Sequence, residues 1–312
     1  MPNSALRHPP SVTRPPLLLA GPTAVGKSEL ALHLAEKLNG EIISVDSMQV
    51  YRGLDIGTAK PSAEERQRIP HHLIDVANLN EPFDAAQFVR LAHAAVVEIQ
   101  SRGHVPILCG GTGLYFKAFL EGLGEAPPAD ATLRAELEKT PLPEMLRELE
   151  QRDPVTYEKI DRQNPRRIIR ALEVIRLTGK PFSVQRADWS SRTTHHAPNF
   201  FVLSREATDL QSRINTRVDA MFKSGLVAEV KELLQHGLAE NKTAMQAIGY
   251  RQVVEHLHGE RPLPETVELV KIRTRQFAKR QMTWFKRQAQ VTWITLGKHD
   301  RPLEVANQIT YP

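Results

Sequence analysis

Short apolar runs alternate with helix-patterned segments along most of the chain. Six such runs end at a polar or glycine-rich junction, at residues 17–20, 42–45, 73–76, 105–109, 201–203 and 291–295. Runs of this length are typical of buried β-strands. Strands that alternate with helices form a mainly parallel sheet covered on both faces, with ligands at the carboxyl ends of the strands. We therefore expect an α/β protein.

The strand pattern is interrupted between residues 125 and 199. Helical patterns broken by several prolines occupy this segment, which predicts a helical insertion into a core formed by 17–124 and 200–312. The leader at 1–16 contains five prolines and few apolar residues, so we expect it to be disordered. A transit peptide is the alternative, because this leader carries Arg7 and Arg14 and no acidic residue.

The segment after the first apolar run has the pattern of a phosphate-binding loop. Its glycines let backbone N–H groups surround phosphate oxygens, Lys27 adds a positive charge, and the Ser28 hydroxyl can bind Mg²⁺. The predicted loop consists of Gly21, Pro22, Thr23, Ala24, Val25, Gly26, Lys27 and Ser28. The loop by itself does not identify the phosphate ester, and ATP in a small-molecule kinase is the first candidate.

Two other strand ends carry candidate chemistry. Asp46 follows the run 42–45, where a carboxylate could bind Mg²⁺ through water, accept a proton from a nucleophile, or only cap a helix. Thr112 lies among three glycines after the run 105–109 and can donate a hydrogen bond to a leaving oxygen, although a tight strand-to-helix turn would use the same residues. Motor ATPases usually place an Asp that binds Mg²⁺ at the end of the strand corresponding to the run 105–109. This run ends at Cys109 and is followed by two glycines, which argues against a motor ATPase.

Charge, cysteine content and hydrophobicity indicate which kinds of partner and compartment suit the chain. The formal net charge is +5, and residues 261–290 hold eight Lys or Arg against two Glu, a basic stretch suited to nucleic acid or phosphate. The single cysteine, Cys109, excludes an internal disulfide and favours a reducing compartment. No run approaches the ~20 apolar residues that span a bilayer, so we expect no membrane segment.

The three junctions, together with ordered blocks at 46–61, 70–75, 164–173, 247–252 and 274–284, resemble the tRNA dimethylallyltransferases, the isopentenyl transferases of tRNA. The resemblance runs from about residue 17 to residue 293. It implies a P-loop, nucleotide-kinase-like core with a helical insertion that contacts the tRNA anticodon stem-loop. It also implies transfer from dimethylallyl diphosphate to N6 of the adenosine 3′-adjacent to the anticodon, with Mg²⁺ as cofactor. Without the zinc finger of eukaryotic members, we expect a bacterial-type, monomeric, cytoplasmic enzyme.

The resemblance assigns roles to individual residues. Asp46 would orient the adenine amine or take its proton, while Lys27, Thr112, Arg217 and Mg²⁺ at Ser28 would stabilise the departing diphosphate. For Arg217, which shares a helix face with Arg213, a solvated charged face is the alternative. The adenine would have to leave its stack to reach the site. Residues implied to contact tRNA are Asp46, Ser47, Met48, Gln49, Thr112, Arg134, Arg166, Arg167, Ile168, Ile169, Arg170, Gln246, Ala247, Ile248, Gly249, Tyr250 and Arg251.

Two other function classes share parts of this pattern. A small-molecule or nucleotide kinase has the loop and the sheet, but it does not account for the helical insertion or the basic segment. A non-catalytic RNA-binding module would need neither the intact loop nor Asp46. Arginines in the helical insertion could be a solvated face rather than an RNA contact.

Overall fold

The computed structural model describes residues 14–187, 199–288 and 291–311, so nearly all of the predicted leader lies outside the described residues. Its contacts divide the chain into two compact units. The first unit comprises Met1–Phe119 and Thr194–Pro312, and the second comprises Leu120–Thr193. In the described part of the chain, no helix has the length and apolar character needed to cross a membrane.

The first unit is built on a six-stranded sheet in which all neighbouring strands run parallel. This confirms the α/β fold with a parallel sheet. The order is β3-β2-β4-β1-β5-β6, with β1 (Leu17–Ala20), β2 (Gly40–Val45), β3 (His71–His72), β4 (Val105–Gly110), β5 (Phe200–Arg205) and β6 (Thr292–Leu296). Because β1, β2 and β4 are adjacent, the loops that follow them open at one edge of the sheet.

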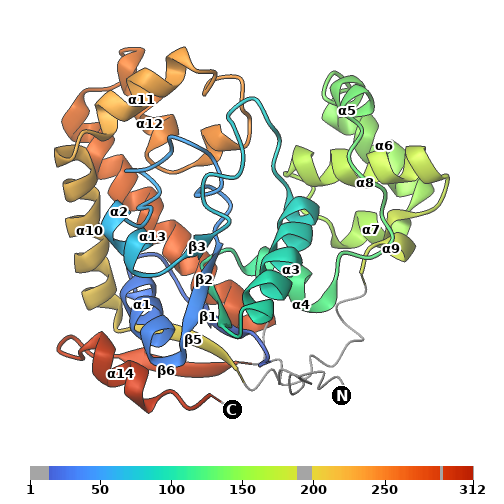
Figure 1. Cartoon of the computed structure of the whole chain (residues 1–312). Helices are drawn as coiled ribbons and strands as arrows, with labels where there is room; N and C mark the ends of the chain where they lie inside the picture. The colour runs from blue at the N-terminus through green and yellow to red at the C-terminus, as the bar shows by residue number, and fades with distance from the viewer. Residues whose placement is uncertain (1–13, 188–198, 289–290, 312) are drawn as a thin grey trace, which may run out of the picture. The chain divides into compact units, whose positions relative to one another are not determined.

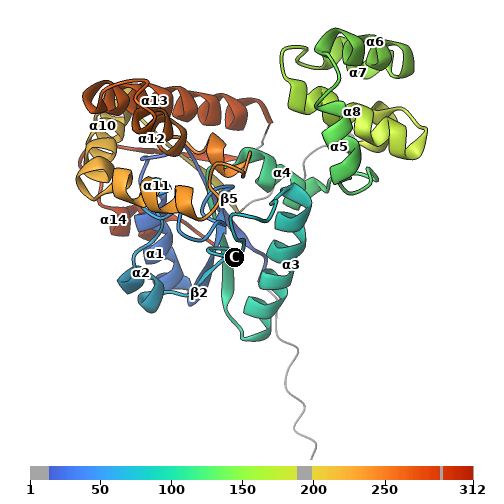
Figure 2. The same cartoon turned by 90° about the horizontal axis from the view of Figure 1, so that it is seen from above.

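Helices cover both faces of this sheet (Figures 1 and 2). Successive residues of β1 point to opposite faces: Leu17 and Leu19 join one apolar cluster, and Leu18 and Ala20 join the other. The first cluster includes residues of α1 and α14, and the second includes residues of α3, α4, α11, α12 and α13. Helices of this unit are α1 (Lys27–Leu38), α2 (Ala63–Arg68), α3 (Ala85–Ser101), α4 (Gly113–Glu121, reaching into the second unit), α10 (Ala207–Lys223), α11 (Leu226–Gln235), the 3₁₀ turn η1 (Ala244–Gln246), α12 (Tyr250–Leu257), α13 (Leu263–Gln288) and α14 (Pro302–Gln308).

The strand predicted at 73–76 is wrong in position. β3 covers only His71–His72, because Leu73 and Asp75 have φ angles of 60° and 58°, a left-handed conformation that a strand cannot adopt. The Asp75 carboxylate instead accepts hydrogen bonds from Lys60 Nζ at 2.5 Å and Arg66 at 2.8 Å. Burial raises the pKa of Asp75, but these two bonds outweigh it and the net shift is downward.

The second unit consists of short helices around a core of its own. These are α5 (Ala131–Leu137), α6 (Leu142–Arg152), α7 (Pro154–Lys159), α8 (Pro165–Thr178) and α9 (Phe182–Gln185). Ile168, Leu172 and Ile175 form the buried stripe of α8, as their helical spacing predicts. Asn164 caps this helix through the N–H of Arg167, and Pro165 occupies its first turn.

A buried carboxylate lies near the amino end of β2, away from the strand ends that carry the predicted site. Glu41, 2% exposed, accepts hydrogen bonds from Arg102 Nη2 at 2.7 Å, and its oxygens lie 2.6 Å from His72 Nε2 and 2.7 Å from His104 Nδ1. Burial raises the pKa of Glu41, but the bonds from Arg102 and the two histidines outweigh it and hold the pKa at about 2.

Glu41→Gln is therefore expected to change the acid stability of the protein. A carboxyl group whose pKa falls from 4.5 to about 2 on folding stabilises the fold fully above its unfolded pKa and loses that contribution as the pH falls toward 2, a difference of about 3 kcal/mol. Urea unfolding between these pH values should show a larger loss in the unsubstituted protein than in the variant, in which Asp75 and other carboxylates still titrate. Glu98→Gln, which removes an exposed partner of Arg102, is the control; equal acid sensitivity of the unsubstituted protein and Glu41→Gln would contradict the assignment.

Candidate active site at the carboxyl edge of the sheet

The predicted phosphate loop connects β1 to α1 and ends in a left-handed turn. Gly26 precedes the helix with φ 110°, and Ala24 has φ 63°, so the Gly26 position favours glycine. Among the hydrogen bonds of the described residues, the backbone N–H groups of Gly26, Lys27 and Ser28 have no acceptor. Unpaired N–H groups at a helix amino terminus bind anions. The loop therefore has the geometry of a phosphate site.

Two arginines to which the sequence analysis assigns no role at the loop hold it from outside. Arg205 Nε donates to Val25 O at 2.8 Å, and Arg213 Nε donates to Ala24 O at 2.9 Å. Because the two arginines bind these carbonyl oxygens, the oxygens point away from a bound anion and do not repel it. Arg205 is also fixed by Asp209 at 2.8 Å. Both arginines thus support the loop conformation that phosphate binding requires.

Positive charge collects at the loop. Burial lowers the pKa of Lys27 to about 8; Cys109 opposes this shift, Arg217 adds to it, and Asp46 opposes it. Burial and the neighbouring Arg213 also lower the pKa of Arg217. Across the described ranges, neither Arg213 nor Arg217 forms an ion pair with a carboxylate. The charge interaction between them shows that Lys27 and Arg217 lie near each other, and a multiply charged anion bound there would relieve their repulsion.

Asp46 and Thr112 meet at the ends of β2 and β4. One oxygen of Asp46, Oδ1, accepts the N–H groups of Met48 at 2.8 Å and Gln49 at 3.3 Å. Its second oxygen has no hydrogen-bond donor among residues the structure describes. Thr112 Oγ1 accepts the N–H of Ser47 at 3.2 Å, which leaves the hydroxyl proton for a ligand oxygen. The carboxylate can therefore accept a proton, and the threonine can donate a hydrogen bond.

The glycines beside Thr112 allow helix α13 to approach closely. A Cβ on Gly111 would lie 2.2 Å from Gln281 Nε2, and a Cβ on Gly113 would lie 2.2 Å from the ring of Trp284. The Gln281 amide accepts the N–H of Thr23 at 2.9 Å and donates to Gly111 O at 2.9 Å. Gln281 lies within the block 274–284 that carries the family resemblance, but the sequence pattern gives it no role of its own.

Several residues predicted to contact tRNA support neighbouring loops in the structure. The Gln49 amide donates to Thr58 O and Ala59 O at 3.1 and 3.3 Å. Tyr250 is fully buried; its hydroxyl donates to Glu229 at 2.6 Å and accepts the N–H of Gly57 at 3.1 Å. Around Tyr250, the exposed positions are Gln246 and Arg251, while Ala247 and Gly249 are buried and Ile248 is half-buried. A direct RNA contact at this segment would thus fall to Gln246 and Arg251.

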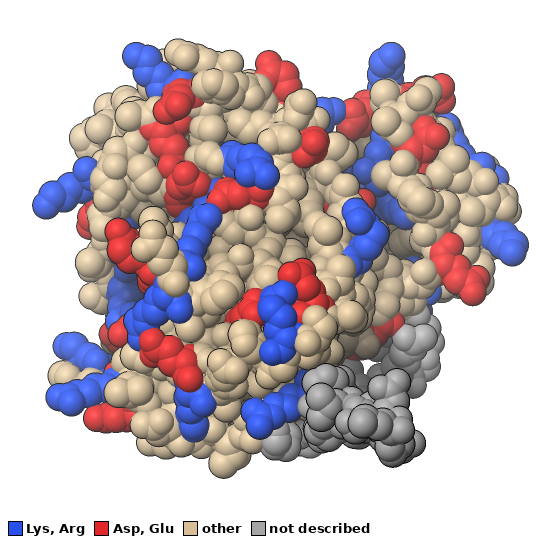
Figure 3. Space-filling view, in the orientation of Figure 1, with Lys and Arg blue, Asp and Glu red and all other residues tan. Residues whose placement is uncertain are grey.

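Within the second unit, the predicted RNA-binding residues divide into two groups. Ile168 is fully buried in the core. Arg134 and Arg170 bind Glu173, which is fully buried, at 2.8 and 2.6 Å. Arg166 and Arg167 are exposed in the first turn of α8, and Ile169 is half-buried there. On the face seen in Figure 3, basic and acidic side chains are interspersed, and this face carries no single basic field.

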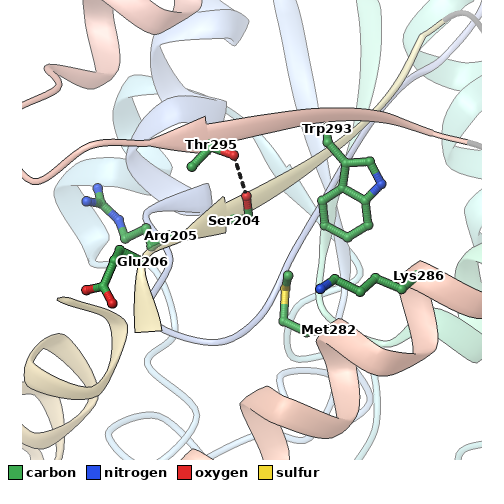
Figure 4. Close-up of a pocket in the computed structure, with 7 residues that line it drawn as sticks. All are labelled: Ser204, Arg205, Glu206, Met282, Lys286, Trp293 and Thr295. Carbon is green, nitrogen blue, oxygen red and sulfur yellow. Dashed lines mark hydrogen bonds between the residues drawn. The ribbon is translucent and has the colours of Figure 1, made fainter. Parts of the chain in front are cut away.

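A cavity of about 590 Å³ lies beside the phosphate loop. The residues that line this cavity include none of the predicted site residues. In Figure 4 the Trp293 ring and the Met282 and Lys286 side chains face it from β6 and α13, and the Ser204 and Thr295 hydroxyls lie 2.9 Å apart on β5 and β6. Arg205 and Glu206 complete the lining. Because Arg205 donates to Val25 O, this cavity and the loop share one side chain.

Comparison with known proteins identifies the family. The family model described as "IPP transferase" matches residues 49–288. The chain belongs to the IPP transferase family. Among relatives of this IPP transferase chain, a "tRNA dimethylallyltransferase 1" of Trichlorobacter lovleyi is 47% identical over 93% of this chain and 96% of the relative. A "tRNA dimethylallyltransferase" of Desulforudis audaxviator is 43% identical over 96% of this chain and 97% of the relative.

Solved structures of IPP transferases share the fold. The full-length tRNA isopentenylpyrophosphate transferase of Bacillus halodurans is 41% identical, with a TM-score of 0.67, over 93% of this chain and 94% of that one. A eukaryotic dimethylallyltransferase acting on tRNA is 29% identical, with a TM-score of 0.74, over 91% of this chain and 74% of that one. Both sequence and fold therefore place the chain in this family.

Proposed function

We propose that the chain transfers a dimethylallyl group from dimethylallyl diphosphate to N6 of the adenosine 3′-adjacent to the anticodon in tRNA and releases diphosphate. The observation that carries this proposal is the phosphate loop, with Lys27 and Arg217, at the same edge of the sheet as Asp46 and Thr112, in a chain of the IPP transferase family. The relatives named above are tRNA dimethylallyltransferases. Nothing in the site favours the kinase alternative.

Asp46 assists the nucleophile in this proposal. The N6 lone pair of adenine is delocalised into the ring, so the amine is a weak nucleophile. As N6 forms a bond to the allylic C1, the C1–O bond to the diphosphate breaks and N6 must lose a proton. The second carboxylate oxygen of Asp46, which has no donor in the described structure, accepts that proton. Its first oxygen keeps the turn at Met48 in place.

Lys27, Arg217 and Thr112 stabilise the leaving diphosphate. Lys27 and Arg217 place positive charge where negative charge increases as the C–O bond breaks. The Thr112 hydroxyl donates a hydrogen bond to the departing diphosphate. Its oxygen accepts the N–H of Ser47, and its proton remains available for this bond. These groups are positioned before reaction, so little reorganisation is required.

The residues present suit Mg²⁺. Ser28 stands in the first turn of α1, exposed, and its hydroxyl has no hydrogen-bond partner among residues the structure describes. A hydroxyl together with diphosphate oxygens and water makes the hard oxygen set that this ion prefers. Mg²⁺ held by Ser28 would neutralise charge on the diphosphate.

The proposed function includes tRNA contacts, an oligomeric state and a location in the cell. Exposed Arg166 and Arg167, with Gln246 and Arg251, would contact the anticodon stem-loop, and the target adenine would be extruded from its stack into the site beside Asp46. A monomer acting in the cytoplasm completes the proposal.

Purified protein incubated with labelled dimethylallyl diphosphate, Mg²⁺ and unmodified tRNA is expected to transfer the label to RNA without consuming ATP. The loop in this proposal holds a leaving group rather than a phosphoryl donor, so ATP has no part in the reaction. Chromatography of digested tRNA gives the modified nucleoside directly. Labelling that requires ATP turnover would overturn the proposed function.

Arg166→Ala combined with Arg167→Ala is expected to weaken tRNA binding and flatten its salt dependence. Removing one bond to a phosphate lowers the slope of log affinity against log salt by about one unit. Titrations at several salt concentrations measure that slope. Lys159→Ala, an exposed cation in the same unit, is the matched control. Unchanged affinity and slope in the double variant would make the arginine pair a solvated face.

A further inference from the structure

Gln281 joins the two halves of the candidate active site. This side chain lies on α13 and is 8% exposed. Its Oε1 accepts the N–H of Thr23 in the phosphate loop at 2.9 Å, and its Nε2 donates to the carbonyl of Gly111 at 2.9 Å. A single amide thus connects the end of β1 with the end of β4, in addition to the sheet hydrogen bonds between those strands.

Glycines on the Thr112 turn make room for the contact with Gln281. Gly111 leaves no room for a Cβ, which would lie 2.2 Å from Gln281 Nε2 and 3.3 Å from Gly21 O. One turn later, Trp284 of the same helix fills the space over Gly113. The glycines therefore admit α13 against the turn that carries Thr112. A side-chain amide offers a donor and an acceptor on separate atoms at any ordinary pH, as this arrangement requires.

The two segments that Gln281 joins act on the same leaving group in the proposed reaction. The loop holds Lys27 and binds the diphosphate, and the turn presents the Thr112 hydroxyl to it. If the loop and the turn separate, each can still bind the diphosphate, but not in the geometry of the transition state. Displacements of about 1 Å in such sites can cost 10²-fold in rate.

We propose that Gln281 is a positioning residue of the transferase, which fixes the phosphate loop relative to the Thr112 turn. This proposal rests on the proposed function. The amide touches neither the allylic carbon nor the adenine; it acts through Thr23 and Gly111. Its loss should therefore lower the rate of transfer with little effect on how tightly tRNA binds.

Gln281→Met tests the proposal, since methionine has a similar length and makes neither hydrogen bond. The single-turnover transfer rate should fall about 10²-fold, with unchanged tRNA affinity and inhibition by inorganic diphosphate weakened. Gln276→Met, an exposed glutamine on the same helix, should transfer at the original rate. An unaltered rate in Gln281→Met, or a loss of tRNA affinity alone, would overturn the positioning role. If the unsubstituted protein transfers no label, the proposed function fails instead.

Gln281→Glu supplies a readout that loss of folding cannot imitate. A carboxylate can accept from Thr23 but cannot donate to Gly111 O, whereas a protonated carboxyl group does both. Burial raises the pKa of such a group, so the rate of this variant, relative to the unsubstituted protein, should recover as the pH is lowered from about 8 to about 5.5. Gln276→Glu should show no relative recovery. A constant ratio for Gln281→Glu across this range would reject the donor to Gly111 O, and it decides the question even if Gln281→Met does not fold.

Discussion

Asp46→Asn is expected to slow single-turnover transfer by about 10²- to 10⁴-fold, the usual contribution of a general base, without changing the melting temperature. The local structure explains why the two effects separate. Asp46 Oδ1 accepts the N–H groups of Met48 and Gln49, and the amide oxygen of asparagine accepts the same bonds. What the variant loses is the charge and the proton-accepting second oxygen. Rapid-quench measurement of label transfer isolates this chemical step from product release.

The chain offers a matched control for this substitution. Asp84 caps α3 through the N–H groups of Ala86 and Gln87, both at 2.9 Å, so Asp84→Asn makes the same chemical change at an exposed helix cap that has no part in the proposed reaction. Its transfer rate should stay unchanged. A near-native rate in Asp46→Asn would remove Asp46 from proton transfer and leave the diphosphate-binding groups as the source of catalysis.

Lys27→Met is expected to lower kcat/KM for dimethylallyl diphosphate by about 10²- to 10³-fold, the range for removing one preorganised donor to a developing negative charge. The same lysine predicts a pH dependence. Because its pKa in the free enzyme is about 8, the ammonium is charged below that pH and neutral above it. Since kcat/KM reports the free enzyme, it should fall on the alkaline side of pH 8.

Lys27→Arg tests this alkaline limb, because arginine keeps its charge and should move the fall in kcat/KM to higher pH. Lys37→Arg is the control, since Lys37 binds the carbonyl groups of Ala306 and Ile309 and should leave the profile in place. An identical alkaline limb in Lys27→Arg and in the unsubstituted protein would assign that titration to another group.

Much of the fold could be predicted because it depends on local patterns. Continuous apolar runs at 17–20 and 105–109 become β1 and β4 with boundaries within one residue. The run at 73–76 failed because its apolar pattern does not reveal the left-handed backbone at Leu73 and Asp75. Hydropathy describes burial, whereas this turn brings the half-buried Asp75 into an ion pair with Lys60, fifteen positions earlier in the chain.

The site shows a similar division. Lys27, Asp46 and Thr112 could be predicted because each follows a strand, and the carboxyl ends of adjacent parallel strands meet. Arg205 and Gln281 could not be predicted, because their partners lie 180 and 258 residues away in the chain. Tyr250 shows a different limit. The family resemblance implies an RNA contact, whereas the structure adds a buried role, because the Tyr250 hydroxyl accepts the N–H of Gly57 and donates to Glu229.

The strand order also has a consequence for synthesis of the protein. β1 is central in the sheet, and its neighbour β5 pairs Phe200 with Leu18, so the phosphate loop is translated well before β5 and is enclosed only after β5 has been made. By contrast, the core of the helical unit comes from one continuous stretch, Leu120–Thr193. On the ribosome, that unit can complete its core while the edge of β1 remains unpaired. Nascent chains halted before β5 are therefore expected to hold a folded helical unit and a nucleotide-kinase-like half that still needs protection from aggregation.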